Sequence, residues 1–295
     1  MTTTDAVIAL KRASRPRPTV RRMTTETSTI VLIHGVWMTP LSWEHWIDRY
    51  RRAGHEVLAP AWPGLDRDVD ALREDPSAIE HLGVEEIVDH YDGIIRALDA
   101  PPIIMGHSFG GAFTEVLLDR GLGAAGVAID AAAVRGIKTL PPAQLKAAWP
   151  VLKNPANNHR AVMLTPSEFR YAFANTMSED DALAAYERYA VPGPGRVLFQ
   201  GARANFKPHA ATRVDFHNDD RAPLLLIAGG ADHTVPAAVD EATAKRYRKS
   251  KAVTDYKLFP DRSHFTIGEA GWEQMADYAL QWAVDHARGA VPAPS

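Results

Sequence analysis

The stretch Gly106-His107-Ser108-Phe109-Gly110 decides the fold prediction for this chain. It follows the apolar run Pro102–Met105, which predicts a buried strand, and it precedes a helical pattern that continues to Gly121. A serine between two glycines at a strand-to-helix turn is typical of a nucleophile elbow, in which a strained backbone lifts the hydroxyl above the sheet edge. The helix directs its first N–H groups toward charge that develops near the serine oxygen. Ser108 is therefore the predicted nucleophile.

A serine hydroxyl needs a general base, and the base needs an acid that orients it. Asp232 lies in a loop after the strand pattern Leu224–Ala228, and His264 lies in a loop after the next one, Val253–Phe259. This gives the chain order Ser, acid, His that such sites require, and loops at the carboxyl ends of parallel strands meet at one sheet edge. We expect His264 to take the proton from Ser108 and Asp232 to accept a hydrogen bond from the other ring nitrogen.

The charge that develops in such a reaction needs two backbone donors near the serine oxygen. The N–H of Phe109, directly after the nucleophile, is the first expected donor. The loop His34-Gly35-Val36-Trp37, which follows the first predicted strand, is expected to supply the second. Within that loop Val36 is the preferred donor and Trp37 is the alternative.

Three other patterns compete with these assignments. Asp130 ends a predicted strand and is the rival of Asp232 for the role of the acid. The stretch Gly121–Gly126 fits G-x-G-x-x-G, but it follows a helix and precedes a strand, which is the reverse of a dinucleotide site. The basic run Lys245–Lys251 ends a predicted helix and indicates a solvated face. We therefore expect no cofactor and no metal ion.

Short apolar runs alternate with helical patterns along most of the chain, which predicts parallel strands connected by helices. The alternation breaks between about residues 134 and 220, where helical patterns occur without a convincing strand. The predicted strands are Thr29–Ile33, Glu56–Ala59, Pro102–Met105, Gly126–Ile129, Pro223–Ala228 and Ala252–Phe259. The predicted helices include Glu85–Leu98, Pro142–Trp149, Ser167–Thr176, Glu179–Tyr189 and Trp272–Val284.

The turn at Ser108, His34-Gly35, Asp232 and His264 together resemble the α/β-hydrolase family, over about residues 28 to 287. The likeness is to the branch of capped bacterial esterases and cofactor-free haloperoxidases. It implies an α/β fold with a mostly parallel, eight-stranded sheet that is flanked by helices and carries a helical cap. Residues 28–133 and 221–288 would form the hydrolase core, and residues 134–220 would form the cap.

The leading hypothesis for function is a serine hydrolase that cleaves a small apolar ester, of the carboxylesterase or lactonase type, through an acyl-enzyme on Ser108. The alternatives use the same residues for C–C bond hydrolysis, a lyase reaction or a cofactor-free oxygenase or perhydrolase reaction, or make the chain a non-catalytic ligand receptor. An apolar substrate pocket is expected under the cap. Its expected lining residues are Trp37, Trp149, Met163, Phe169, Phe173, His233 and Phe265.

Composition limits the remaining function classes. The 295 residues include no Cys, which excludes disulfides and thiolate chemistry, and the formal charge of -3 argues against a general nucleic-acid binder. No apolar run approaches the roughly 18 residues of a membrane span. Residues 1–27 are basic and are expected to be a flexible segment, with a nucleic-acid or membrane arm as the alternative, and residues 289–295 a tail. We expect a cytoplasmic enzyme that acts on a small molecule without nucleic-acid or membrane partners, and we leave its oligomeric state open.

Overall fold

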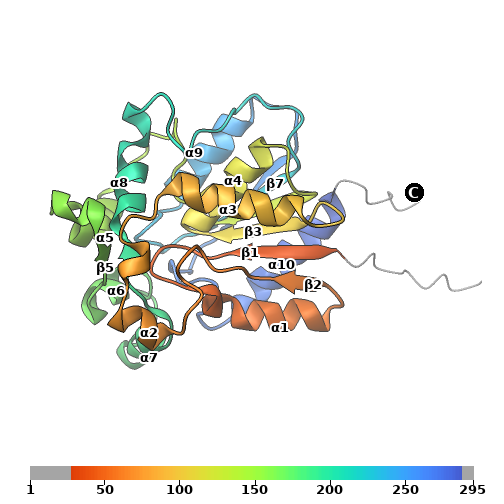
Figure 1. The fold of residues 1–295 in the computed structure, drawn as a ribbon. Helices are drawn as coiled ribbons and strands as arrows, with labels where there is room; N and C mark the ends of the chain where they lie inside the picture. The colour runs from red at the N-terminus through yellow and green to blue at the C-terminus, as the bar shows by residue number, and fades with distance from the viewer. Residues whose placement is uncertain (1–27, 288–295) are drawn as a thin grey trace, which may run out of the picture.

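The computed structural model describes residues 28–287, so the predicted basic segment 1–27 and the tail 289–295 lie outside the described residues. Its central sheet contains the six predicted strands, each within two residues of its expected ends. They are β1 (Thr29–Ile33), β2 (Glu56–Leu58), β3 (Ile103–His107), β4 (Ala125–Ile129), β7 (Leu224–Gly229) and β8 (Thr254–Phe259). All pairings are parallel, and the strand order is β2-β1-β3-β4-β7-β8 (Figure 1). The parallel sheet is confirmed, whereas the expected number of eight strands is wrong for the described part, which has six.

The inner strands β1, β3, β4 and β7 are buried on both faces, as expected for a sheet that helices cover on both sides. In β1, Ile30 and Leu32 belong to one buried cluster, while Val31 and Ile33 belong to the other. Helices α1 (Glu44–Arg52) and α10 (Trp272–His286) cover the first face, and α3 (Val84–Arg96), α4 (Phe109–Asp119) and α9 (Ala238–Tyr247) cover the second (Figure 1). The buried indole of Trp46 and the hydroxyl of Tyr50 tie α1 to the C-terminal region, because they donate to the carbonyls of Ile267 and Ala276.

Between β4 and β7 the chain leaves the sheet for residues 134–220, which we call the insertion. It contains α5 (Pro142–Leu152), α6 (Pro166–Ala172), α7 (Glu179–Tyr189) and α8 (Gly195–Arg203), and also two short antiparallel strands, β5 (Ala161–Val162) and β6 (Gly193–Pro194). The expectation that this block has no strand is wrong to that extent. The remaining elements are α2 (Val69–Glu74) and the 3-10 helices η1 (Pro40–Trp43), η2 (Ser77–Ile79), η3 (Pro155–His159) and η4 (Ala204–Phe206). Among residues 28–287, no helix is both long and apolar enough to cross a membrane.

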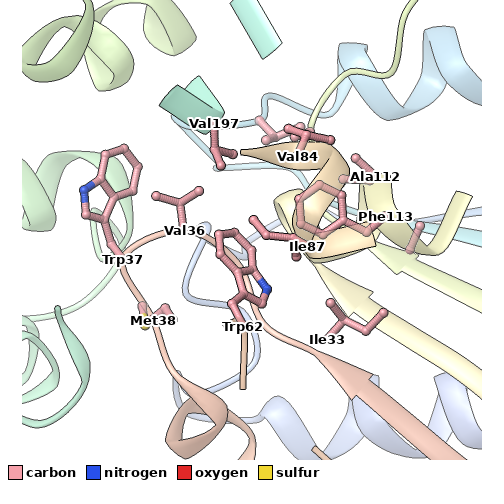
Figure 2. Close-up of a cluster of buried hydrophobic side chains, with 14 of the residues drawn as sticks. Ile33, Val36, Trp37, Met38, Trp62, Val84, Ile87, Ala112, Phe113 and Val197 are labelled. Carbon is pink, nitrogen blue, oxygen red and sulfur yellow. The ribbon is translucent and has the colours of Figure 1, made fainter. Parts of the chain in front are cut away.

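The loop after β1 joins the sheet to the insertion through a shared apolar cluster. Figure 2 shows Val36 and Trp37 in this cluster beside Trp62, with Val197 reaching in from α8. The indole N–H of Trp37 donates to the carbonyl of Val162 at 3.0 Å, and the carbonyl of Trp37 accepts from the backbone N–H of Val191. The loop is thus held by the sheet on one side and by the insertion on the other.

A buried polar cluster lies on the α4 and α9 side of the sheet. Burial raises the pKa of Glu115 to about 8, and the neighbouring hydroxyl of Tyr247 and the charge of Arg221 offset only part of this effect. The guanidinium of Arg221 lies over the Tyr247 ring at 4.6 Å. Because an ionised carboxylate would be costly there, Glu115 keeps its proton in the folded protein at neutral pH.

Replacing Glu115 by Gln tests this assignment. The unfolded chain loses the Glu115 proton above about pH 4.5, whereas the folded protein holds it up to about pH 8. Stability from this group is therefore present below pH 4.5 and is lost as the pH rises through that window, by at most about 1.4 kcal/mol per pH unit. Denaturant unfolding should show the stability of E115Q rising relative to the wild type between pH 5 and pH 8. The exposed control E241Q on α9 should show no such trend, and a constant difference for E115Q would contradict the assignment.

Candidate active site

Ser108 occupies the sharp turn between β3 and α4. Its backbone has φ of 59°, in the left-handed region that non-glycine residues rarely adopt, and its N–H donates to the carbonyl of Ile129 at 2.9 Å. The flanking glycines are needed because backbone approaches backbone. A Cβ on Gly106 would lie 2.0 Å from the carbonyl oxygen of Gly110, and one on Gly110 would lie 2.1 Å from the carbonyl oxygen of Ile33. The backbone at the end of β1 therefore leaves no room for a side chain at position 110.

The structure brings the three predicted residues Ser108, Asp232 and His264 together. Nε2 of His264 lies 3.0 Å from Oγ of Ser108, and Nδ1 of His264 lies 2.6 Å from Oδ2 of Asp232. Both the His264 and the Asp232 side chains are fully buried. The other carboxylate oxygen of Asp232 accepts from the N–H groups of Thr234 and Val235 at 2.6 and 2.8 Å. With these bonds Asp232 remains an acceptor that holds a proton on Nδ1 of His264, which leaves Nε2 free to take the Ser108 proton.

Buried rings hold the His264 imidazole from two sides. The ring of His107 lies 4.6 Å from it and that of Phe173 lies 4.9 Å from it, edge-on. Nε2 of His107 donates to the carbonyl of His264 at 2.8 Å, and burial, followed by the nearby His264, lowers the pKa of His107 well below its usual range. His107 is therefore neutral and fixes the backbone of His264. The N–H of Phe265, which directly follows His264, donates to the carbonyl of Phe173.

Asp130, the rival acid, lies behind the triad without a hydrogen bond to His264. Its Oδ1 accepts from the N–H of Gly229 at 2.5 Å, and burial, together with the charge of Asp232, raises its pKa well above the usual range. Ligand atoms of His107, Asp130 and His264 lie within 4.8 Å of one another. A cation there would have to replace a hydrogen bond of His264 to Asp232 or Ser108. We therefore interpret Asp130 as a neutral acid packed beside the triad.

The loop after β1 lies against Ser108. A Cβ on Gly35 would be only 2.7 Å from Cβ of Ser108, and Trp37 has φ of 67°. The N–H groups of Val36, Trp37 and Phe109 donate to no acceptor within the described residues. All three of these residues line the cavity beside Ser108. Unpaired backbone donors at this place can stabilise an oxyanion that forms next to the serine oxygen.

His34 holds this loop from below. Burial lowers the pKa of His34 to about 4, so its ring is neutral at physiological pH. Its Nδ1 donates to the carbonyl of Gly35 at 2.9 Å, and its Nε2 accepts from the N–H of Trp62 at 3.2 Å. The ring also stacks on the Trp62 indole at 4.9 Å. One neutral tautomer satisfies all of these contacts, which explains why a histidine precedes Gly35.

A cavity of about 500 Å³ opens beside Ser108 and extends between α5 and α8. Its walls are mainly apolar, and most of them come from the insertion. They include Ile137, Ala147, Ala148, Leu152, Leu198 and Gly201, and the core contributes Thr234 and Val235. The outer end is lined by Leu140, Leu145 and Phe206. An apolar group attached to a reacting carbonyl at Ser108 could therefore extend along the insertion.

Of the seven residues expected to line the pocket, only Trp37 does so. Phe169 and Phe173 stack on each other at 5.0 Å inside the apolar core, and Phe265 and Met163 also pack in or against that core. The ring of His233 is hydrogen-bonded to the carbonyl of Tyr171, and Trp149 is exposed on the outside of α5. The spacing of Phe169 and Phe173 indicated that they share one helix face. It did not indicate that this face packs against Phe265 instead of lining the cavity.

Two groups of residues were not anticipated from the sequence. The first is the pair of N–H donors of Thr234 and Val235 on Asp232, which the pattern Asp-x-Thr could have indicated, because Asp side chains often accept from the backbone two residues on. The second is the small-residue wall of α5 and α8. For this wall the sequence held no signal, because alanines and a glycine in a helix predict close packing as readily as a cavity.

Comparisons with known proteins agree with this architecture. A family model described as "Alpha/beta hydrolase family" matches residues 30–278. No curated protein matches the chain. Among solved structures, a monoacylglycerol lipase from Paleococcus ferrophilus is 22% identical with a TM-score of 0.59, over 88% of this chain and 95% of that one. An extracellular α/β-hydrolase from a Paenibacillus species is 21% identical with a TM-score of 0.63, over 88% and 99%. A methylesterase from Arabidopsis is 14% identical with a TM-score of 0.58, over 87% and 98%. At these identities the likeness establishes a shared fold.

A pair of glycine substitutions tests whether backbone contact fixes the turn. In G110A the new methyl group would overlap the carbonyl of Ile33, and we expect a loss of at least about 3 kcal/mol in the free energy of unfolding. In the control G93A, on α3, a Cβ would meet nothing within 4 Å, so a gain of about 0.5–1 kcal/mol is expected. Denaturant unfolding of both variants measures the difference. A G110A protein as stable as the wild type would show that β1 and the turn do not constrain each other.

Proposed function

The chain belongs to the α/β-hydrolase family, and from this premise we propose that it is a carboxylic ester hydrolase that forms an acyl-enzyme on Ser108. The observation that carries the proposal is the pair of hydrogen bonds made by His264, at 3.0 Å to Ser108 and at 2.6 Å to Asp232. A hydroxyl, an imidazole and a carboxylate in this order can activate a nucleophile at neutral pH.

In the first half of the proposed reaction, Nε2 of His264 takes the proton from Oγ of Ser108 as Oγ bonds to the ester carbonyl carbon. The carbonyl oxygen becomes an oxyanion, and the N–H groups of Phe109 and Val36 donate to it. The C–O bond to the alcohol then breaks, and the alkoxide leaves with the proton from His264. The acyl group remains on Ser108.

In the second half, His264 takes a proton from a water molecule whose oxygen attacks the acyl carbonyl. The same N–H groups stabilise the second oxyanion. Its collapse breaks the bond to Oγ, which recovers a proton from His264, and the carboxylic acid leaves. Asp232 stays ionised throughout and stabilises the imidazolium that forms twice.

We propose that the insertion acts as a cap that selects the substrate, while residues 28–133 and 221–288 form the catalytic core. Walls from α5 and α8 give the cavity its apolar character, and a volume of about 500 Å³ accommodates a small-molecule ester. The substrate class that fits is an ester whose acyl or alcohol part is a medium-sized apolar group.

Replacing Ser108 by Ala tests the covalent route. The variant should lose p-nitrophenyl acetate turnover by at least about a thousandfold, because the nucleophile is absent, and a fluorophosphonate probe should no longer label the protein. Its melting temperature should stay close to that of the wild type, since only a hydroxyl is removed. The exposed control S167A should keep full turnover and labelling. Turnover by S108A at a substantial fraction of the wild-type rate would rule out Ser108 as nucleophile.

Filling the cavity tests the substrate class. Phe in place of Ala148, whose side chain lines the cavity from α5, should lower kcat/KM for p-nitrophenyl octanoate at least about tenfold, because buried methylenes each contribute about 0.8 kcal/mol. The acetate ester should be affected less than about twofold, since its acyl group stays near Ser108. A184F on the outer side of α7 is the matched control. Equal losses for both esters in A148F would show that the chain of the substrate does not occupy this cavity.

A further inference from the structure

The mouth of the cavity is surrounded by large apolar side chains that face outward. Leu140 is 59% exposed, Leu145 46%, Trp149 61% and Phe206 84%. Leu140, Leu145 and Phe206 line the outer end of the cavity, and Trp149 lies one turn after Leu145 on α5. We call these four residues the apolar rim. Clusters of exposed apolar side chains are costly in water and mark contact sites.

The outer face of α5 combines the apolar rim with lysines. Ala147 and Val151 form its buried side, so that Leu145 and Trp149 point outward together with Lys153 at its end and the exposed Lys146. The outer face of α5 therefore presents exposed apolar side chains and basic side chains next to one another.

Charge is distributed unevenly around the rim. The chain as a whole carries a formal charge of -3, yet residues 131–167 and 188–214 contain ten Lys or Arg and no Asp or Glu. These two stretches include α5 and α8, which form the walls of the cavity. The acids of the insertion lie between the two stretches, in residues 168–187, and after them, at Asp215, Asp219 and Asp220. Among residues 28–287, Lys138, which lines the cavity, and the exposed Lys153 after α5 have no carboxylate within 4.0 Å. The ammonium of Lys146 lies over the Tyr171 ring at 3.9 Å. The basic charge at the mouth is therefore available to an external partner.

We propose that the apolar rim and its basic surroundings dock the protein onto an anionic lipid surface, from which an amphiphilic ester enters the cavity. Apolar side chains enter the layer while the lysines contact its negative headgroups, and the cavity that leads to Ser108 opens at the centre of the contact. Figure 1 shows α5 and α8 together at one end of the molecule, beyond the sheet, so a flat surface can reach them. The delivery of an ester to Ser108 rests on the proposed function, whereas the contact with the lipid layer does not need a reaction.

The combination of apolar and basic side chains at the rim favours one kind of binding partner over two others. A neutral apolar partner would gain nothing from the unpaired lysines, whereas an acidic macromolecule without a lipid phase would leave the four apolar side chains in water. An anionic lipid layer accommodates both groups, because its negative headgroups attract the lysines and its apolar interior covers the side chains of the rim.

The test uses the full-length protein and vesicles of phosphatidylcholine, with or without one part in three of phosphatidylglycerol. Co-sedimentation should show binding to the anionic vesicles that is stronger than binding to the neutral ones. W149S and K153E should each weaken binding to the anionic vesicles at least about fivefold, and the conservative variants W149F and K153R should restore it. The matched controls L183S and K249E, exposed on α7 and at the end of α9, should bind as the wild type does.

A second readout separates docking from catalysis. Trp149 and Lys153 lie outside the cavity, so turnover of soluble p-nitrophenyl acetate should be the same in W149S, K153E and the wild type. Vesicle binding that depends on these two residues would support docking even if no ester were hydrolysed. In that case the proposed function fails and the docking surface stands.

Three outcomes would overturn the docking proposal. The first is an absence of wild-type binding to both kinds of vesicle. The second is equal binding by the rim variants and the control variants, which would place the lipid contact elsewhere in the chain. The third is a change of oligomeric state in W149S on size-exclusion chromatography with light scattering, which would make the rim an interface between two copies of this chain.

Discussion

The close contact between the end of β1 and the turn after β3 is the constraint on which the site depends. Gly35 approaches Ser108 so closely that a Cβ would lie 2.7 Å from its Cβ, and Gly110 approaches the carbonyl of Ile33 in the same way. Val36 and Phe109, whose N–H groups donate to no acceptor within residues 28–287, line the same cavity as Ser108. The hydrogen bonds of His264 and Asp232 then act on a serine whose position is already fixed by backbone. Glycine at these points is a steric requirement rather than a source of flexibility.

Trp37 couples the insertion to this contact. Trp37 follows Val36 and is hydrogen-bonded on both sides to the insertion, through its indole N–H to Val162 and through its carbonyl to Val191. The walls of the cavity and the backbone donors beside Ser108 thus belong to one connected network. The insertion therefore contacts both the cavity beside Ser108 and the loop after β1.

The sheet was predictable from the sequence because its inner strands are short apolar runs, and the loops after three of the strands placed Ser108, Asp232 and His264 at one edge. The chain order admits both Asp130 and Asp232, and the preference for Asp232 came from its place in the loop one strand before that of His264. The structure gives the hydrogen bond to Asp232. The number of strands was not predictable in this way, since the expected eight came from a resemblance and not from apolar runs in residues 28–287.

The insertion was predictable as mostly helical but not in its orientation. Phe169 and Phe173 looked like a pocket wall, yet they face Phe265 and His264, while the alanines of α5 line the cavity. Which side of a short helix faces a cavity depends on contacts between segments distant in sequence, and a single-sequence pattern does not contain them. The short strands β5 and β6 were not predicted, because two residues are too few to show an alternation of apolar and polar side chains.

The most direct measurement of the central claim is rapid-quench mass spectrometry of the wild-type protein during reaction with p-nitrophenyl acetate. If Ser108 is activated by His264 and forms an acyl-enzyme, an acetyl group will appear within the first turnover on the peptide that contains Ser108. It will then disappear as the ester is exhausted. Hydrolysis that proceeds with no acetyl group on any peptide, or with a kinetically competent one on a different residue, would contradict the account.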